Sequence, residues 1–167
     1  MYCMMQGRKW FEIVRFQNCK GTENLPWKID TFKKHDYSRH NRTLDIVVKV
    51  EKETKNLWSQ FDLYKCNLNG LPDTCEYYMK DFKVMNICDS IGRKGQLWSN
   101  FVDGIQPRMR CPIKPGVYQS HFSIDDEAFK FVPLPTGLWK LKSYFYQDKE
   151  RLGCVNVDIR ILNNPKI

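Results

Sequence analysis

The chain has 167 residues and a formal net charge of +8, with 42% hydrophobic and 28% charged residues. This length suits one domain with a substantial core, and the apolar content argues against a disordered chain. No apolar run reaches the roughly 18–20 residues that a membrane-spanning helix needs. The positive charge indicates either a solvated basic surface or an anionic partner, such as a membrane, an acidic lipid headgroup or nucleic acid.

The seven cysteines are typical of an oxidising compartment, where cysteines pair as disulfides. A metal site is disfavoured, because the sequence has no Cys-x-x-Cys pair and its three histidines are not spaced as zinc ligands. The odd number leaves one cysteine over, and Cys3 is the natural candidate because residues 1–8 look like a flexible segment. The first residues are too few and too polar for an intact signal peptide, so either a signal was removed or the sequence begins inside one.

Residues 9–167 are expected to form a single domain, which begins with two strands. Lys9 to Phe16 is rich in aromatic and β-branched residues, and Leu25 to Phe32 predicts the second strand. The basic stretch 33–42 has no apolar periodicity and is expected to be a loop, either solvated or a landing patch for anionic headgroups. At its end, the triplet Asn41-Arg42-Thr43 predicts a surface loop that carries a glycan on Asn41.

Alternation of apolar and polar residues predicts the next two strands. Residues 43–50 place Leu44, Ile46, Val48 and Val50 on one face, which indicates a half-buried strand. Residues 56–64 alternate as well, and the polar turn between the two segments predicts that they form a hairpin. Trp58 follows this turn, where it either packs in the core or contacts a ligand or membrane at the rim.

The middle of the chain predicts helices. Between Glu76 and Ile91, apolar residues recur at steps of three and four, which predicts one amphipathic helix with its apolar stripe in the core. Just before it, Cys66 and Cys75 flank a run of turn-forming residues, so a local disulfide is expected there. The apolar run 96–105 predicts a short second helix or an apolar flap.

Three more strands are predicted at residues 117–124, 138–147 and 154–162. Several short strands separated by turn signals favour a mostly antiparallel β-sandwich over a βαβ fold. Before the second of these strands lies a proline-interrupted apolar loop, which contains Phe129, Phe131, Val132 and Leu134. These side chains cannot all face one core, so some are expected to be exposed or to line the mouth of a cavity.

The sequence contains no motif that predicts catalysis. It has no Gly-x-Ser-x-Gly elbow, His-Glu-x-x-His, phosphate loop or dinucleotide fingerprint, so we expect neither an enzyme nor a bound cofactor. The acidic triplet 125–127 is interpreted as a solvated turn, since its spacing does not build a calcium cage. Nucleic acid is disfavoured as a partner, because the lysines are spread along the chain and disulfides indicate the wrong compartment.

Several short motifs follow one another from about residue 10 to residue 162. They are Phe16-Gln17-Asn18-Cys19, Asn41-Arg42-Thr43-Leu44, Val50-Glu51-Lys52-Glu53 with Leu57-Trp58, Thr74-Cys75, Cys88-Asp89, Cys111-Pro112 with Gly116-Val117-Tyr118, Thr136-Gly137, and Arg151-Leu152-Gly153-Cys154. Through these motifs the chain resembles the ML lipid-recognition superfamily, and within it the ganglioside activator protein and the insect chemosensory B proteins.

The resemblance implies an immunoglobulin-like β-cup with one or two short helices and a hydrophobic cavity between its sheets. It also implies three disulfides: Cys19–Cys154, Cys66–Cys75 and Cys88–Cys111. The family's apolar rim carries over onto Leu57, Trp58, Phe129, Phe131, Val132 and Leu134, and the predicted flap adds Trp98 and Phe101. Two departures are that the activator's fourth disulfide has no counterpart and that the segment between Cys75 and Cys88 is longer; both fit an invertebrate branch better.

The expected function is therefore that of a secreted or lysosomal lipid-binding or lipid-transfer protein without enzymatic activity. Its cup would hold a glycolipid, fatty acid or pheromone-like lipid, and its rim loops would touch membranes transiently. The alternative is an accessory module that binds a receptor or a hydrolase through the same loops.

Overall fold

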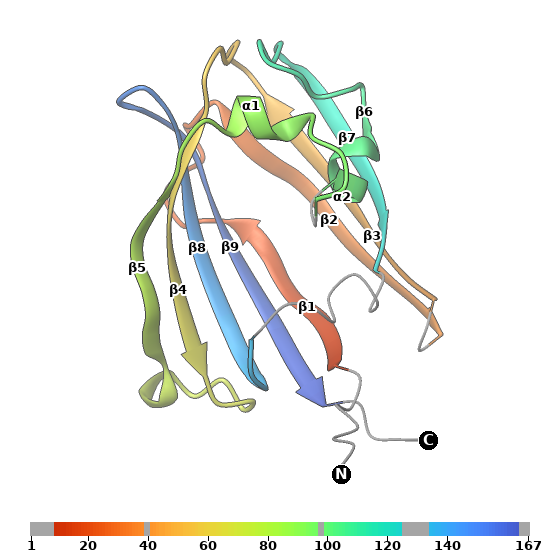
Figure 1. Cartoon of the computed structure of the whole chain (residues 1–167), viewed down its shortest axis with the longest axis vertical. Coiled ribbons are helices and arrows are strands. Elements are labelled where there is room, and N and C mark those ends of the chain that lie inside the picture. Colours follow the sequence, from red (N-terminus) through yellow and green to blue (C-terminus); the bar gives the residue numbers. More distant parts are fainter. Residues whose placement is uncertain (1–8, 39–40, 97–98, 125–133, 164–167) are drawn as a thin grey trace.

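The computed structural model describes residues 9–38, 41–96, 99–124 and 134–163. Their strands form two antiparallel sheets that pack face to face, and this confirms the predicted immunoglobulin-like β-sandwich with short helices (Figure 1). The five-stranded sheet has the order β1 (Lys9–Asn18), β9 (Glu150–Asn163), β8 (Gly137–Gln147), β4 (Trp58–Cys66), β5 (Glu76–Val84). The four-stranded sheet has the order β2 (Trp27–Ser38), β3 (Asn41–Val50), β7 (Gly116–Ser123), β6 (Ile105–Gln106).

Three short helical segments complete the described fold: a 3-10 turn (Pro72–Thr74), α1 (Ile87–Ile91) and α2 (Ser99–Asp103). The helix α1 lies across one end of the sandwich, and α2 packs beside β7 (Figure 1). Among the described residues, no helix is long and apolar enough to cross a membrane.

The alternating strands form as their sequence predicts. In β3, Leu44, Ile46 and Val50 are buried between the sheets, while Lys49 is exposed on the outer face. In β9, Val157 and Ile161 take the inward positions. Because successive side chains of a strand point to opposite faces, this pattern fixes which face of each strand meets the other sheet.

The two sheets are joined along the side where β1 lies next to β2. The side-chain amide of Asn18 donates to the backbone oxygen of Ile29 and accepts from its N–H, both at 2.9 Å. The two hydrogen bonds of this amide therefore resemble those of a strand-to-strand pair and link the two sheets. Further along, the buried Arg42 of β3 donates to the backbone oxygen of Phe11 in β1.

Three disulfide bonds link the same pairs that the resemblance implies: Cys19–Cys154, Cys66–Cys75 and Cys88–Cys111. The first ties the end of β1 to β9 across 135 residues of sequence. The second closes the turn between β4 and β5, and the third holds α1 against the segment that precedes β7. Each bond removes freedom from the unfolded chain, and the longest loop is expected to contribute most.

The described interior contains two separate apolar clusters. The larger lies at the α1 end and includes Leu57, Ile113 and Leu152, while the smaller is built on Phe11, Trp139 and Ile161. A domain of this size normally has one contiguous core. The division leaves room between the sheets for a chamber.

The predicted helix over residues 76–91 is wrong, because residues 76–84 form the edge strand β5 and only Ile87–Ile91 is helical. Two register shifts against β4 each add one residue to β5, and such bulges erase the period of two. The spacing of four residues between the apolar side chains of Tyr78 and Phe82 is compatible with a helix and with a strand. In the structure Tyr78 packs edge-on against Trp139 at 4.9 Å, and Phe82 lies 5.1 Å from Phe61.

The basic loop predicted at residues 33–42 is also wrong. The strand β2 continues through Ser38, and Asn41 already belongs to β3. As an edge strand, β2 needs backbone pairing on one side only and carries charged side chains at its rim, as edge strands commonly do. Arg42, expected in a solvated patch, is 5% exposed and lies 3.7 Å from the centre of the Trp10 ring.

The hairpin predicted between residues 43–50 and 56–64 does not form, because β3 and β4 belong to different sheets. The polar segment between them crosses from one sheet to the other. Thr54, at its centre, is fully buried and exchanges two backbone hydrogen bonds with Ile113, at 2.9 and 2.8 Å. The polar segment is therefore a crossover between the sheets, and its one buried residue, Thr54, is fixed by contacts with a distant part of the chain.

Candidate functional site: an apolar chamber between the sheets

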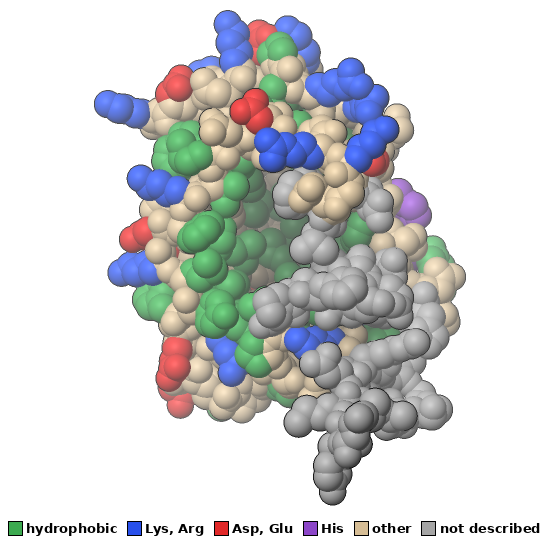
Figure 2. Space-filling view, viewed as in Figure 1, with side chains coloured by type: hydrophobic (Ala, Val, Ile, Leu, Met, Phe, Trp, Pro, Cys, Tyr) green, Lys and Arg blue, Asp and Glu red, His purple; other side chains and the backbone are tan. Residues whose placement is uncertain are grey.

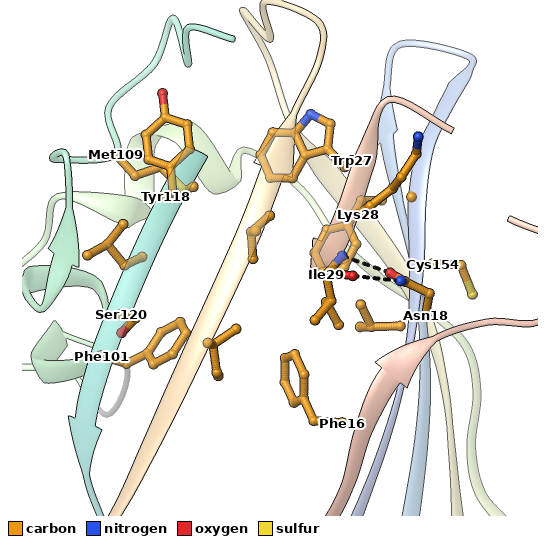
Figure 3. Close-up of a pocket in the computed structure, with 16 residues that line it drawn as sticks. Phe16, Asn18, Trp27, Lys28, Ile29, Phe101, Met109, Tyr118, Ser120 and Cys154 are labelled. Carbon is orange, nitrogen blue, oxygen red and sulfur yellow. Dashed lines mark hydrogen bonds between the residues drawn. The ribbon is translucent and has the colours of Figure 1, made fainter. Parts of the chain in front are cut away.

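A chamber of about 180 Å³ lies between the two sheets, next to the larger apolar cluster. Both sheets and α2 contribute to its walls (Figure 3). Its lining is almost entirely apolar and consists of Phe16, Asn18, Trp27, Lys28, Ile29, Ile46, Val48, Phe101, Ile105, Met109, Tyr118, Ser120, Phe145, Gly153, Cys154 and Val155.

The chamber owes its apolar walls to the inward positions of the strands around it. Ile46 and Val48 come from β3, and Val155 comes from the facing strand β9. Val48 and Val155 are only partly buried although they point between the sheets. Side chains at such positions are normally enclosed, so their partial exposure shows that no other described side chain fills the space beside them. The described residues enclose the chamber only in part. Figure 2 shows hydrophobic side chains gathered along a recess between the sheets.

Two close approaches shape the walls. The ring of Phe101, on α2, meets Phe122 of β7 edge-on, with 5.7 Å between their centres. On the other side, Gly153 lets β9 approach the start of β2: a Cβ atom there would lie 2.9 Å from the backbone oxygen of Trp27. Any larger residue at position 153 would therefore push β2 and β9 apart and distort the wall.

Most polar groups in the lining already have partners. The Trp27 indole N–H donates to the Thr54 hydroxyl at 3.1 Å, and the Tyr118 hydroxyl donates to the backbone oxygen of Lys114 at 2.6 Å. Lys28 pairs with Glu51 at 3.2 Å. The hydroxyl of Ser120 differs, because it is buried without a hydrogen-bond partner.

Among the described residues of the lining, no nucleophile is paired with a base, and the shifted pKa values of the described residues belong to groups elsewhere. The pKa of Asp45 is lowered, chiefly because His121 hydrogen-bonds to its carboxylate, with His35 as a second partner. These three side chains lie on neighbouring strands of the four-stranded sheet, and none of them lines the chamber. Among the described residues, no group of three potential ligands could hold a metal ion.

A second pocket lies on the surface between α1, α2 and the segment before β7. Its volume is about 320 Å³, and charged residues of both signs, including Asp89, Asp103, Arg108 and Arg110, contribute to its walls. Such a mixed lining has neither the apolar area to hold a hydrophobic ligand nor a single sign of charge to hold an ion. The chamber is therefore the stronger candidate site.

The predicted rim residues fall in several places. Phe101 lines the chamber, and its role as a ligand contact stays a prediction. Leu57 is 4% exposed in the larger cluster, so it is a core residue and not part of a rim. Trp58 lies outside the chamber lining, where it stacks on Tyr146 at 4.3 Å and donates to the backbone oxygen of Asp148 at 2.7 Å.

The structure says less about the other predicted contact residues. Leu134 packs against the smaller cluster, and Trp98, Phe129, Phe131 and Val132 lie outside the described residues. Asn41 is exposed at the start of β3, and its glycosylation stays a prediction. The sequence reasoning missed most of the chamber lining, notably Phe16, Trp27 and Met109. The one available signal was their place at inward positions of strands or in the segment that covers them.

No protein-family model and no curated protein matches the sequence. Solved structures that are similar to the chain include two that share most of its length. A Niemann-Pick type C2 protein from the Japanese carpenter ant is 14% identical, with a TM-score of 0.42 over 86% of this chain and 96% of the other. Chicken MD-1, solved in complex with lipid IVa, is 10% identical, with a TM-score of 0.37 over 90% of this chain and 96% of the other.

Proposed function

We propose that this protein binds the apolar part of a lipid or a similar small molecule in the chamber between its sheets. The observation that carries the proposal is an apolar, solvent-accessible chamber of about 180 Å³. A dry apolar cavity of about 150 Å³ is already enough to bind a small aromatic molecule. The chamber therefore suits one ring or a short stretch of hydrocarbon chain, while the rest of a larger lipid would extend through the opening.

The finer parts of the proposal come from the sequence. Three disulfides favour an oxidising, extracellular or lysosomal compartment, and the net charge of +8 favours transient contact with anionic membranes. We assign membrane contact to the apolar loop around Phe129 and Phe131, and transfer of a glycolipid, fatty acid or pheromone-like lipid follows if the ligand leaves the chamber there.

A dye-binding experiment tests the chamber directly. Val48→Phe and Val155→Phe each place a ring in the chamber from opposite walls, and both should weaken the binding of the apolar dye N-phenylnaphthylamine. Val117→Phe is the matched control, because Val117 is 47% exposed and does not line the chamber. Equal dye affinity in all three variants and the wild type would refute the proposal. Native mass spectrometry of the purified protein should also reveal a bound lipid.

A liposome flotation assay tests membrane contact. We expect the wild type to float with anionic vesicles and the double variant Phe129→Asp, Phe131→Asp to stay in solution. Each phenylalanine side chain contributes about 1.5–3 kcal/mol when it moves from water into lipid, so replacing both with aspartate should abolish reversible attachment. Equal flotation of the two proteins would show that this loop does not carry the contact.

A protein partner, such as a receptor or hydrolase, is the second candidate. It is favoured by the edge strand β5 and the residue after it, which expose Tyr77, Tyr78, Phe82 and Met85. Edge strands offer unpaired backbone groups, and exposed apolar side chains often mark partner surfaces. Failure of dye binding, together with loss of partner binding in Phe82→Asp, would favour this function over lipid binding.

A further inference from the structure

The charged pocket between α1, α2 and the segment before β7 takes its two signs of charge from different elements. Asp89 lies on α1 and Asp103 ends α2, whereas Arg108 and Arg110 belong to the segment that follows β6. Its volume of about 320 Å³ is at the lower end of the range for small-molecule sites. The pocket therefore has the size for a small ligand and offers it carboxylates from the helices and guanidinium groups from the segment beside them.

None of these four charged side chains has a partner within the described part of the chain. No hydrogen bond or ion pair joins them to one another or to any other described residue. Elsewhere in the described structure such pairs do form, for example between Arg15 and Asp158 at 3.2 Å. Opposite charges attract each other, so a molecule that carries both signs would satisfy the two sets of side chains at once.

The disulfide bond Cys88–Cys111 holds the two sides of the pocket in place. Its cysteines also line the pocket, and their Cα atoms lie 5.7 Å apart. Asp89 directly follows the first cysteine and Arg110 directly precedes the second. The backbone positions of this acid and this arginine are therefore fixed before a ligand arrives, which lowers the entropy that binding would cost.

We propose that this pocket binds a small zwitterion that carries a phosphate and a primary ammonium group. Each guanidinium group can donate two parallel hydrogen bonds to phosphate oxygens, and the two carboxylates accept from the ammonium. A quaternary ammonium fits less well, because such groups are recognised by aromatic rings and none of the described lining residues is aromatic. This inference goes beyond the proposed function and stands without it.

Two sources fit this ligand chemistry: a free small molecule, and the headgroup of a lipid whose chain enters the chamber. The second source is considered because Met109 contributes to the walls of both the pocket and the chamber. On α2, Phe101 lines the chamber while the next residue, Val102, lines the pocket. The two spaces are thus neighbours, and the experiment must tell the two sources apart.

The probe for the pocket itself is phosphoethanolamine, titrated into isotope-labelled protein in a buffer without phosphate or zwitterions and followed through amide chemical shifts. Arg108→Gln and Asp89→Asn should each lower its affinity by about tenfold, as expected for hydrogen bonds to charged groups. Arg93→Gln is the matched control, because Arg93 is exposed just after α1 and does not line the pocket. All three variants should unfold at nearly the same urea concentration as the wild type, since none loses a described side-chain partner.

Inorganic phosphate and ethanolamine measure the two halves of the site. Each should bind more weakly than phosphoethanolamine, because each satisfies only one set of charges. Inorganic phosphate that binds as tightly as phosphoethanolamine would overturn the inference, since the carboxylates would then play no part. The absence of chemical-shift changes in the wild type, or equal affinity in Arg108→Gln and the wild type, would overturn it as well.

Lysophosphatidylethanolamine, measured by displacement of N-phenylnaphthylamine, separates the two sources. If the zwitterion is a lipid headgroup, Arg108→Gln should lower the affinity for this lysolipid about tenfold while Arg93→Gln leaves it unchanged. If phosphoethanolamine binding depends on Arg108 but lysolipid binding does not, the pocket serves a free small molecule. Failure of the wild type to bind the dye would overturn the proposed function alone, because the phosphoethanolamine titration does not use the chamber.

Discussion

The bond between Asn18 and Ile29 gives the sharpest test of how the sheets are held at the chamber wall. Asn18→Asp keeps the shape of the side chain and the oxygen that accepts from the Ile29 N–H at 2.9 Å. It replaces the nitrogen that donates to the Ile29 backbone oxygen, also at 2.9 Å, with a second oxygen. At neutral pH this oxygen is ionised, so a bond becomes a repulsive contact between two acceptors.

The size of the effect follows from the groups that lose their partners. A buried acceptor left without a donor costs about 1–3 kcal/mol, and Asn18 is half-buried, so we expect the lower half of that range for Asn18→Asp at neutral pH. Asn18→Ala removes both bonds and should cost about the same or slightly more.

The acidity of the medium separates the two variants. The backbone oxygen of Ile29 disfavours the ionised form of the introduced carboxyl, so its pKa in the folded protein should be raised above the ordinary aspartate value of about 3.9. Because this pKa is higher in the folded state, the protonated carboxyl stabilises the protein fully at pH values below the unfolded pKa. The stabilisation is lost as the pH rises through the folded pKa. Once protonated, the carboxyl can donate to Ile29 as the amide does.

The assay is urea unfolding followed by circular dichroism at about pH 3 and pH 7. Asn18→Asp should be clearly less stable than the wild type at pH 7 and close to it at pH 3. Asn18→Ala should show the same deficit at both values, because it introduces no titrating group. A deficit in Asn18→Asp that does not shrink on acidification would refute the role of the amide as a donor between the sheets.

Two further predictions concern the frame around the chamber, and a third concerns the pairing of Asp45 with His121 and His35 on the four-stranded sheet. Replacing the Cys19–Cys154 pair with alanines should lower the free energy of unfolding by about 5 kcal/mol, and replacing Cys66–Cys75 should lower it by about 2.5 kcal/mol. The difference arises because the two bonds span 135 and 9 residues. Equal losses in urea unfolding would contradict the loop-entropy account. Gly153→Ala should cost about 1–3 kcal/mol through its clash with β2, whereas Gly92→Ala, with open space around its Cβ, should be close to neutral in the same assay. Asp45→Asn should be less stable than the wild type at about pH 5, and this difference should vanish as the pH falls below 3. The pKa of the Asp45 carboxyl is lowered by its histidine partner, so the carboxyl loses its stabilising effect when it is protonated.

Strands with a regular period of two could be predicted from the sequence, because each has one face in the core. In β3, Leu44, Ile46 and Val50 mark the buried face without help from any other part of the chain. The same holds for β9, where Val157 and Ile161 do so. The fold class followed from the number of such strands and the turn signals between them, and neither depends on long-range contacts.

The errors fall where pairing with another segment overrides the pattern within a segment. The bulges of β5 come from its register against β4, and no residue within β5 reveals them. The far half of β2 is a strand because β3 pairs with it, not because residues 33–38 favour one. The crossover at the buried Thr54 depends on Ile113, 59 positions later. The partner of Thr54 is remote in sequence. For β2 and β5 the partner strand is the preceding or following strand of the chain, but it lies outside the segment whose own pattern was read.

From the sequence, the chamber could be expected only through the family resemblance. An inward apolar residue gives the same sequence pattern whether it is packed in a core or lines an empty space. Val48 and Val50 are two inward residues of the same strand, and only their exposure tells the chamber from the core. The position of Ser120 could be recognised as unusual from the sequence. It occupies an inward position between Tyr118 and Phe122, where burial in a dry core would leave its hydroxyl without a bond. A polar residue that interrupts the buried face of a strand is therefore the local signal most worth reading, since packing alone does not explain it.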